Sequence, residues 1–186
     1  MGALIAVIVV VVIILIVVLW YIATRNGIIA SRNRVDESWS GIDVQLKRRH
    51  DLVPNLVETV KGYATHEQQV FENVTKARAD AMATTGVGDT AQAEGNLTRA
   101  MADLRAVAEN YPDLKATENF QQLSRNLSEL EDEIQASRRI YNSNVQSYNT
   151  KIQRFPTSIV ASQGNFEDKE FFEIVEAERE TPAVSF

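Results

Sequence analysis

The sequence predicts an all-α protein: an N-terminal transmembrane helix, an antiparallel four-helix bundle with long helices, and an irregular acidic C-terminal tail. Three observations predict it: an uninterrupted apolar run at the start, helical spacing of apolar side chains beyond it, and few prolines or glycines to interrupt that spacing. The predicted regions are a signal-anchor at 1–24, a juxtamembrane linker at 25–33, the bundle at 34–156 and the tail at 157–186.

Composition excludes several classes of function. The chain has no cysteine, which rules out disulfides and thiolate metal sites. Residues 25–164 carry 18 acids and 17 bases, so they lack the excess positive charge of a nucleic-acid-binding surface. The end of the chain is acidic, because residues 165–186 hold seven acids and two bases.

The first stretch of the chain is typical of a membrane span. Residues 3–22 are all apolar or aromatic, and a helix of about 20 such residues crosses the hydrocarbon core of a bilayer. Trp20, Tyr21 and Arg25 would lie at the membrane interface, where aromatic and basic side chains gather. A cleaved signal peptide is disfavoured because no basic segment precedes the run and no A-x-A-like site follows it.

Charges beside this span predict its orientation. Arg25, Arg32 and Arg34 follow it before the first acid, Asp36, and positive charges near a membrane end prefer the cytoplasmic side. We therefore expect the N-terminus outside and the bundle in the cytoplasm, with the opposite orientation as the alternative.

Apolar side chains recur in heptads from Val35 to Ala81, a pattern typical of helices that pack as in a coiled coil. Twelve of the 14 a and d positions are apolar, and Arg49 and Glu67 are the exceptions. The pattern predicts amphipathic helix throughout this part of the chain.

Two interruptions divide the heptads. Pro54 has no backbone N–H, so we expect a kink near residues 50–53. Gly62 suits a helix end, and Thr65-x-x-Gln68 fits a capping box that would begin a new helix. A break is therefore predicted within 61–67.

Two more helices are predicted beyond a turn at 84–88. Asp89-x-x-Gln92 fits a cap, Pro112 a break and Pro156 a stop. The four predicted helices span about 34–62, 65–84, 90–109 and 116–155. Two long helices flanking two short ones suit an up-down-up-down bundle. The predicted core stripe of the last helix is Phe120, Leu123, Leu127, Leu130, Ile134, Tyr141, Val145, Tyr148, Ile152 and Phe155.

The densest charge cluster is the strongest candidate site, and it lies just before Pro54, whose ring frees a backbone carbonyl in the preceding turn. The candidate partner or anion contact comprises Lys47, Arg48, Arg49, Asp51 and Asn55. One alternative is a solvated helix face paired with acids of the last helix. Another is phospholipid contact, which a separation of about 30 Å from the bilayer edge disfavours.

A second candidate contact consists of Tyr141, Asn142, Tyr148 and Asn149. The two Tyr-Asn pairs are seven residues apart and share one side of a helix, so they could form a ladder against another chain. The alternative is structural, with the aromatic rings in the core and the hydroxyls reaching the surface.

No catalytic, metal-ligating or cofactor-binding residue is predicted, and no small-molecule substrate is indicated. His66-Glu67 begins like the zinc motif H-E-x-x-H, but Val70 stands at its fifth position. The glycines at 86 and 88 lack the lysine of a phosphate-binding loop. An enzyme with a site at His50–Pro54 is a less favoured alternative.

The tail contains Phe166, Phe171 and Phe172 among its acids. Exposed apolar clusters usually mark contacts, so we expect the tail to pack against its own bundle or a neighbouring subunit.

Four strings together resemble the LemA family: WSGIDVQLKRRHDLVPNLVETVKGYATHE at 39–67, YPDLKATENF at 111–120, RRIYNSNVQSYNTKIQRFP at 138–156, and FF at 171–172. The resemblance implies a membrane-anchored helical fold and no settled reaction. Some similar proteins replace the anchor with a lipoprotein-type signal, which would place their bundle outside.

The expected function is that of a non-enzymatic scaffold, adaptor or oligomerising protein held at the bilayer, with a protein partner or further copies of itself. The alternative is a structural protein that shapes the membrane or builds a lattice.

Overall fold

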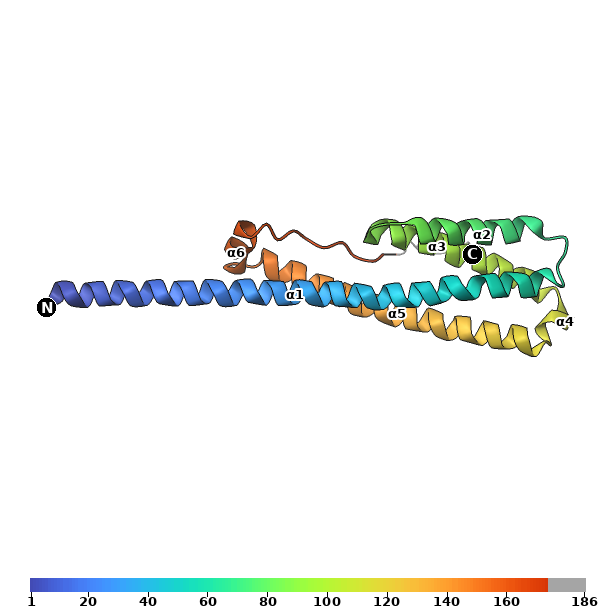
Figure 1. The fold of residues 1–186 in the computed structure, drawn as a ribbon, viewed down its shortest axis with the longest axis horizontal. Coiled ribbons are helices and arrows are strands. Elements are labelled where there is room, and N and C mark those ends of the chain that lie inside the picture. The colour runs from blue at the N-terminus through green and yellow to red at the C-terminus, as the bar shows by residue number, and fades with distance from the viewer. Residues whose placement is uncertain (174–186) are drawn as a thin grey trace, which may run out of the picture. The chain divides into compact units, whose positions relative to one another are not determined.

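The computed structural model of the protein describes residues 1–173, and all regular secondary structure within them is helical. The helices are α1 (Gly2–Lys61), α2 (Gln68–Ala83), α3 (Val87–Glu109), α4 (Pro112–Lys115), α5 (Glu118–Gln153) and α6 (Thr157–Gln163) (Figure 1). The chain divides into two compact units. The first unit comprises residues 1–40 and 140–169, and the second comprises residues 41–139 with the chain from Glu170 on.

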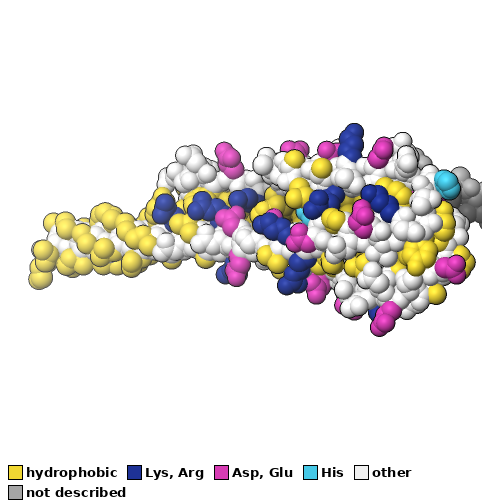
Figure 2. All heavy atoms as spheres, turned by 45° about the vertical axis from the view of Figure 1, so that its right-hand side comes forward, with side chains coloured by type: hydrophobic (Ala, Val, Ile, Leu, Met, Phe, Trp, Pro, Cys, Tyr) yellow, Lys and Arg dark blue, Asp and Glu magenta, His cyan; other side chains and the backbone are white. Residues whose placement is uncertain are grey.

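The first part of α1 is long and apolar enough to cross a membrane. Its most apolar 18-residue window has a mean hydropathy of 3.7, and none of that window is buried. Figure 2 shows hydrophobic side chains along this part of the visible face, with no charged side chain among them. The helix continues unbroken through residues 25–33, so the predicted linker is helical.

In the first unit, α1 packs against the end of α5 and against α6. The rings of Trp39 and Tyr141 lie 5.6 Å apart, and Asn144 Nδ2 donates to the backbone oxygen of Arg34 at 3.4 Å. The buried side chains of this unit include Ile28, Val35, Tyr141, Val145, Tyr148, Ile152, Val160 and Ala161. Most of the predicted stripe of α5 therefore lies in a core.

Phe155 is a correction to that stripe, because 82% of its surface is exposed. Residues 157–163 are a second correction: the tail was expected to be irregular, yet this segment forms α6. Val160 and Ala161 on α6 are buried, and that burial stabilises a helix too short to persist alone in water.

The beginning of the tail contacts its own chain. Asn149 Nδ2 donates to the backbone oxygen of Lys169 at 2.9 Å, and the Lys169 N–H donates back to Asn149 Oδ1 at 2.9 Å. Tyr148 Oη donates to the backbone oxygen of Glu167 at 3.1 Å. The side chain of Phe172 is fully buried in the second unit. The rest of the tail, 174–186, lies outside the described residues.

The second unit has one apolar core, built from α1 beyond residue 40, α2, α3, α4 and the first part of α5. Its fully buried members include Val60, Val74, Leu97, Leu104, Leu114 and Leu127. The predicted break within 61–67 is present, since α1 ends at Lys61 and α2 begins at Gln68. Both predicted caps are wrong: Glu67 and Gly86 are the N-cap residues of α2 and α3, and neither makes a side-chain capping hydrogen bond.

Candidate functional site

A cluster of polar side chains lies inside the second unit. Arg49 and His50 come from α1, Glu94 from α3 and Glu131 from α5. Arg49 is 1% exposed and Glu94 is wholly buried. A buried charge is costly unless it is paired and hydrogen-bonded, so the contacts of these groups decide what the cluster does.

The guanidinium of Arg49 binds two carboxylates. Its Nη2 pairs with the carboxylate of Glu94 and also lies 3.3 Å from the Glu94 backbone oxygen. Its Nη1 donates to Glu131 Oε1 at 2.9 Å and to Thr98 Oγ1 at 3.1 Å. One arginine on α1 therefore joins α1 to both α3 and α5 by charge-assisted hydrogen bonds.

His50 completes the partners of Glu94. Its Nε2 lies 2.7 Å from Glu94 Oε1, and a neutral imidazole donates its N–H to that carboxylate. Burial and the positive charges of Arg49 and Arg78 lower the pKa of His50 to about 4, although Asp51 and Asp43 act in the opposite sense. His50 is therefore neutral at physiological pH.

Pro54 connects this cluster to α2. A helical residue at position 54 would donate its N–H to the carbonyl of His50, four residues earlier, and proline has no N–H to donate. Arg78 of α2 takes that role, with its Nε 2.7 Å from the His50 oxygen. The carbonyl that the sequence predicted to be freed is thus satisfied by a side chain from another helix.

This arrangement corrects two interpretations of the charge cluster. Arg49 does not belong to a solvated face, because it lies in the core. It also offers no anion site open to solvent, because it is buried and its Nη1 and Nη2 are bound by two carboxylates, while Nε is buried without a hydrogen-bond partner among the described residues. The cluster is a buried polar junction between α1, α2, α3 and α5, and it contains both charges of each ion pair.

The other candidate residues of this cluster lie on the surface. Lys47 pairs with Asp43 at 2.6 Å within α1, and Arg48 lies 3.7 Å from Glu133 of α5. Asp51 and Asn55 are exposed. Arg48 and Asp51 help to line a groove of about 340 Å³ between α1 and α5, together with Leu52, Asn126, Glu129, Leu130 and Glu133.

The two Tyr-Asn pairs are separate from this junction and lie in the first unit. Tyr141 and Tyr148 are each 1% exposed, which fits the structural alternative for their rings. Asn149 holds the beginning of the tail, and Asn142 is half-buried. The residues predicted to lie at the membrane interface, Trp20, Tyr21 and Arg25, are all on the unbroken helix α1, and Trp20 is 38% exposed.

Sequence reasoning missed Glu94, Glu131 and Arg78. A signal for Glu94 was present, because it lies three residues before Leu97, and Leu97, Met101 and Leu104 continue the same helical spacing of core residues. Arg49 likewise stands at an a position of the heptads. A charged residue on each of two core-facing stripes is the pattern of a buried ion pair.

The sequence is similar to known proteins. A sequence model of the LemA family matches residues 38–186. Protein LemA of Metamycoplasma hominis is 29% identical over 161 residues, which are 86% of this chain and 73% of the relative.

Two magnetosome proteins are also similar. MamQ 2 of Paramagnetospirillum magneticum is 25% identical over 160 residues, covering 72% of this chain and 59% of the relative. MamQ of Magnetospirillum gryphiswaldense is 23% identical over 159 residues, covering 72% of this chain and 58% of the relative. The chain thus spans somewhat less than two thirds of each MamQ protein.

Proposed function

The chain belongs to the LemA family, and from that premise we propose that it is a membrane-anchored, non-enzymatic scaffold or adaptor. The observation that carries the proposal is the single helix α1, which runs from an exposed apolar stretch into the packed core of the second unit. Such a helix would hold the folded chain at a bilayer.

The proposed domain is an antiparallel four-helix bundle formed by α1, α2, α3 and α5. The apolar cluster shared by these helices supports that arrangement, as does the junction around Arg49. The polar groups with the chemistry of an active site, Arg49 and His50, are bound to the buried carboxylate of Glu94. Neither LemA nor MamQ is named for a catalysed reaction.

The proposed partner contact is the exposed stripe of α1 that contains Lys47, Arg48, Asp51 and Asn55. These four residues are exposed and lie one, three and four positions apart, so they share one face of the helix. The groove beside them combines two leucines with three acids, Asp51, Glu129 and Glu133. Leucines and acids in one groove suit a partner helix with apolar and basic side chains, from another protein or from a second copy of this chain.

Photocrosslinking in native membranes tests this surface. A benzophenone amino acid in place of Asn55 should give one discrete crosslinked product, and Glu129→Lys in the same chain, which places a positive charge against the basic partner, should abolish it. The same probe in place of Lys76, an exposed residue of α2, is the control and should give no such product. Identical products from both positions, or no product from position 55, would contradict the proposed contact.

For sidedness we propose the orientation that the flanking arginines favour, with the bundle in the cytoplasm. Ser128 is exposed on α5, and the chain has no other thiol to react. The variant Ser128→Cys should resist a membrane-impermeant thiol reagent in intact cells and react after lysis. Labelling without lysis would place the bundle outside.

A further inference from the structure

The turn between α5 and α6 exposes apolar side chains together with the first residues of α6; we refer to residues 154–159 as the α5–α6 corner. Phe155 is 82% exposed and Ile159 is 49% exposed. Beyond the apolar run of α1, Phe155 is the most exposed large apolar side chain among residues 1–173. Sequence periodicity placed it in the core, so its exposure calls for another explanation.

Contacts within the first unit fix the level of this corner along α1. Residue numbers fall along α5 as they rise along α1: Tyr141 meets Trp39, and Lys151 Nζ donates to the backbone oxygen of Gly27 at 3.1 Å. Lys151 also donates to the hydroxyl of Ser31. The end of α5 therefore points towards the N-terminal, apolar part of α1.

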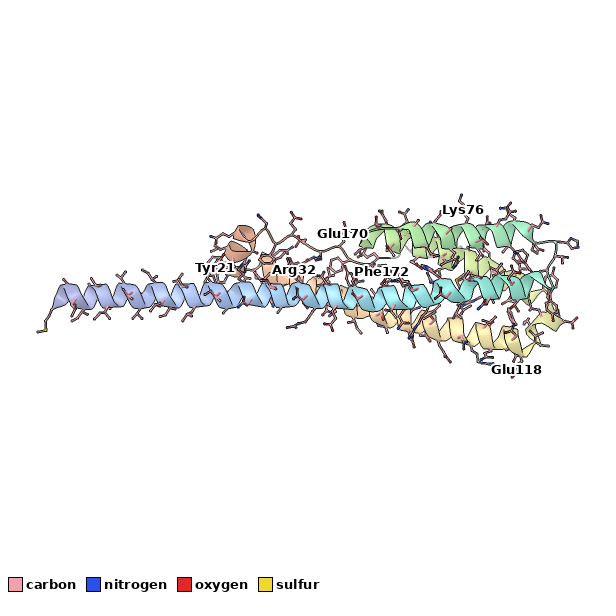
Figure 3. The ribbon with its side chains drawn as sticks, in the orientation of Figure 1. Tyr21, Arg32, Lys76, Glu118, Glu170 and Phe172 are labelled. Carbon is pink, nitrogen blue, oxygen red and sulfur yellow. The ribbon has the colours of Figure 1, made fainter. Side chains whose placement is uncertain are left out.

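The rise of an α-helix, 1.5 Å per residue, turns this register into a position. The last residue of α5, Gln153, lies two residues beyond Lys151, or about 3 Å along the axis, and Phe155 lies in the turn that follows. Ile22, the last residue of the apolar run, lies five residues before Gly27, or about 7.5 Å in the same direction. Phe155 is thus nearly level with the end of the apolar run. Figures 1 and 3 agree, since α6 lies beside α1 close to the labelled Tyr21.

Two cations accompany the apolar side chains. The side chains of Arg25 and Arg154 are exposed, and neither makes an ion pair or a hydrogen bond with any of the described residues. Arg154 also lines a polar groove of about 540 Å³ that includes the hydroxyls of Ser147, Thr150 and Thr157. Free guanidinium groups and hydroxyls are donors that suit phosphate oxygens.

We propose that the α5–α6 corner is a second membrane contact of this protein. Phe155 and Ile159 enter the boundary between headgroups and acyl chains, and Arg25 and Arg154 bind phospholipid phosphates of the same bilayer. Apolar side chains flanked by cations are the composition of interfacial segments, which bind by apolar burial together with attraction to the headgroups. The inference rests on the proposed membrane span of α1, whose interfacial Trp20 and Tyr21 lie at the same level.

The absence of native cysteine allows a direct measurement of depth on the full chain. Nitroxide labels are attached to Phe155→Cys, Ile140→Cys and Val12→Cys in nanodiscs of phosphatidylcholine and phosphatidylglycerol. Accessibility to oxygen, which concentrates in lipid, is compared with accessibility to a water-soluble nickel complex. Ile140 is the matched control, because it is a 59% exposed apolar residue of α5 that lies about 22 Å from Phe155 along the helix.

The label at 155 should show a several-fold higher ratio of oxygen to nickel accessibility than the label at 140. If the labels at 155 and 140 give the same ratio while the label at 12 lies in lipid, the corner does not touch the membrane. The corner proposal then fails and the membrane span of α1 stands. If the label at 12 is also in water, the proposed membrane span of α1 fails together with the corner proposal. A label at 155 shielded from both reagents would mean that protein covers the corner, which also overturns the proposal.

The role of the cations has its own variant. Arg154→Glu, combined with the label at 155, places a negative charge against the phosphates and should lower the oxygen-to-nickel ratio several-fold. The control is Arg139→Glu, at an exposed position inside α5 and away from the corner. It should leave the ratio unchanged. Equal effects of the two variants would contradict phosphate binding by Arg154.

Discussion

Replacing Arg49 by methionine should lower the free energy of unfolding by about 3–5 kcal/mol, the range for breaking a buried ion pair from one side. Arg49 is 1% exposed and Glu94 is wholly buried, so the variant leaves a carboxylate in the core whose remaining partner is the neutral imidazole of His50. Glu131 loses the same partner but keeps 24% of its side chain in solvent, and it contributes less. Chemical denaturation of the full chain in detergent micelles, followed by circular dichroism, measures the change.

Two further variants separate charge from packing. The double variant Arg49→Met/Glu94→Leu removes both buried charges, and it should be more stable than Arg49→Met alone. Lys47→Met removes an ion pair whose lysine is 70% exposed, so it should change stability by less than about 0.5 kcal/mol. A single variant Arg49→Met as stable as the wild type would show that the junction does not hold the helices together.

Acidification should destabilise the protein through His50. The unfolded imidazole takes up a proton near pH 6.5, whereas the folded one, whose pKa is lowered by burial and by nearby arginines, takes it up only near pH 4. Between these values the unfolded state binds more protons, so stability falls as pH falls. The loss is absent above about pH 7 and complete below about pH 4, and it amounts to about 3 kcal/mol for a pKa difference of this size.

The measurement is the free energy of unfolding between pH 7.5 and 4, in the same micelles, for the wild type and two variants. His50→Gln keeps a donor towards Glu94 but cannot be protonated, so its pH dependence should be shallower by the contribution of His50. His66→Gln alters an exposed histidine in the turn after α1 and should retain the slope of the wild type. Equal slopes for all three proteins would exclude a role for His50.

The features of this fold that the sequence predicts are those set by residues close together in the chain. The apolar run and the heptads are local patterns, and they predicted the two ends of α1 but not its continuation through residues 25–33. They also predicted the break at 61–67 and the burial of Leu127 and Tyr148. Period alone cannot place Phe155, because α5 ends at Gln153 and the helical period no longer sets the direction of residue 155. The helix α6 was missed because its stability comes from the burial of Val160 and Ala161, not from any cap.

The site was harder to predict because its contacts are long-range. Arg49 was selected because it belongs to the densest charge cluster of the sequence, and it also stands at a heptad core position. The partners Glu94 and Glu131 lie 45 and 82 residues away, and only the packing of three helices brings them to one guanidinium. Asn149 is similar, since its partner Lys169 belongs to a segment with no periodic pattern.

The proline in α1 has a consequence for how the domain assembles. Most helices can complete their own ladder of hydrogen bonds, so they need neighbours only to cover an apolar face. Helix α1 cannot complete its ladder at His50, because the donor to the His50 carbonyl is Arg78. Arg78 lies on α2, which follows α1 in the chain after a turn. If the core face of α1 lost contact with water before α2 was in place, the carbonyl of His50 would therefore be left without a hydrogen-bond donor. The hydrophobic collapse of α1 and the arrival of α2 are thereby linked, which favours cooperative folding of the helices over their stepwise addition.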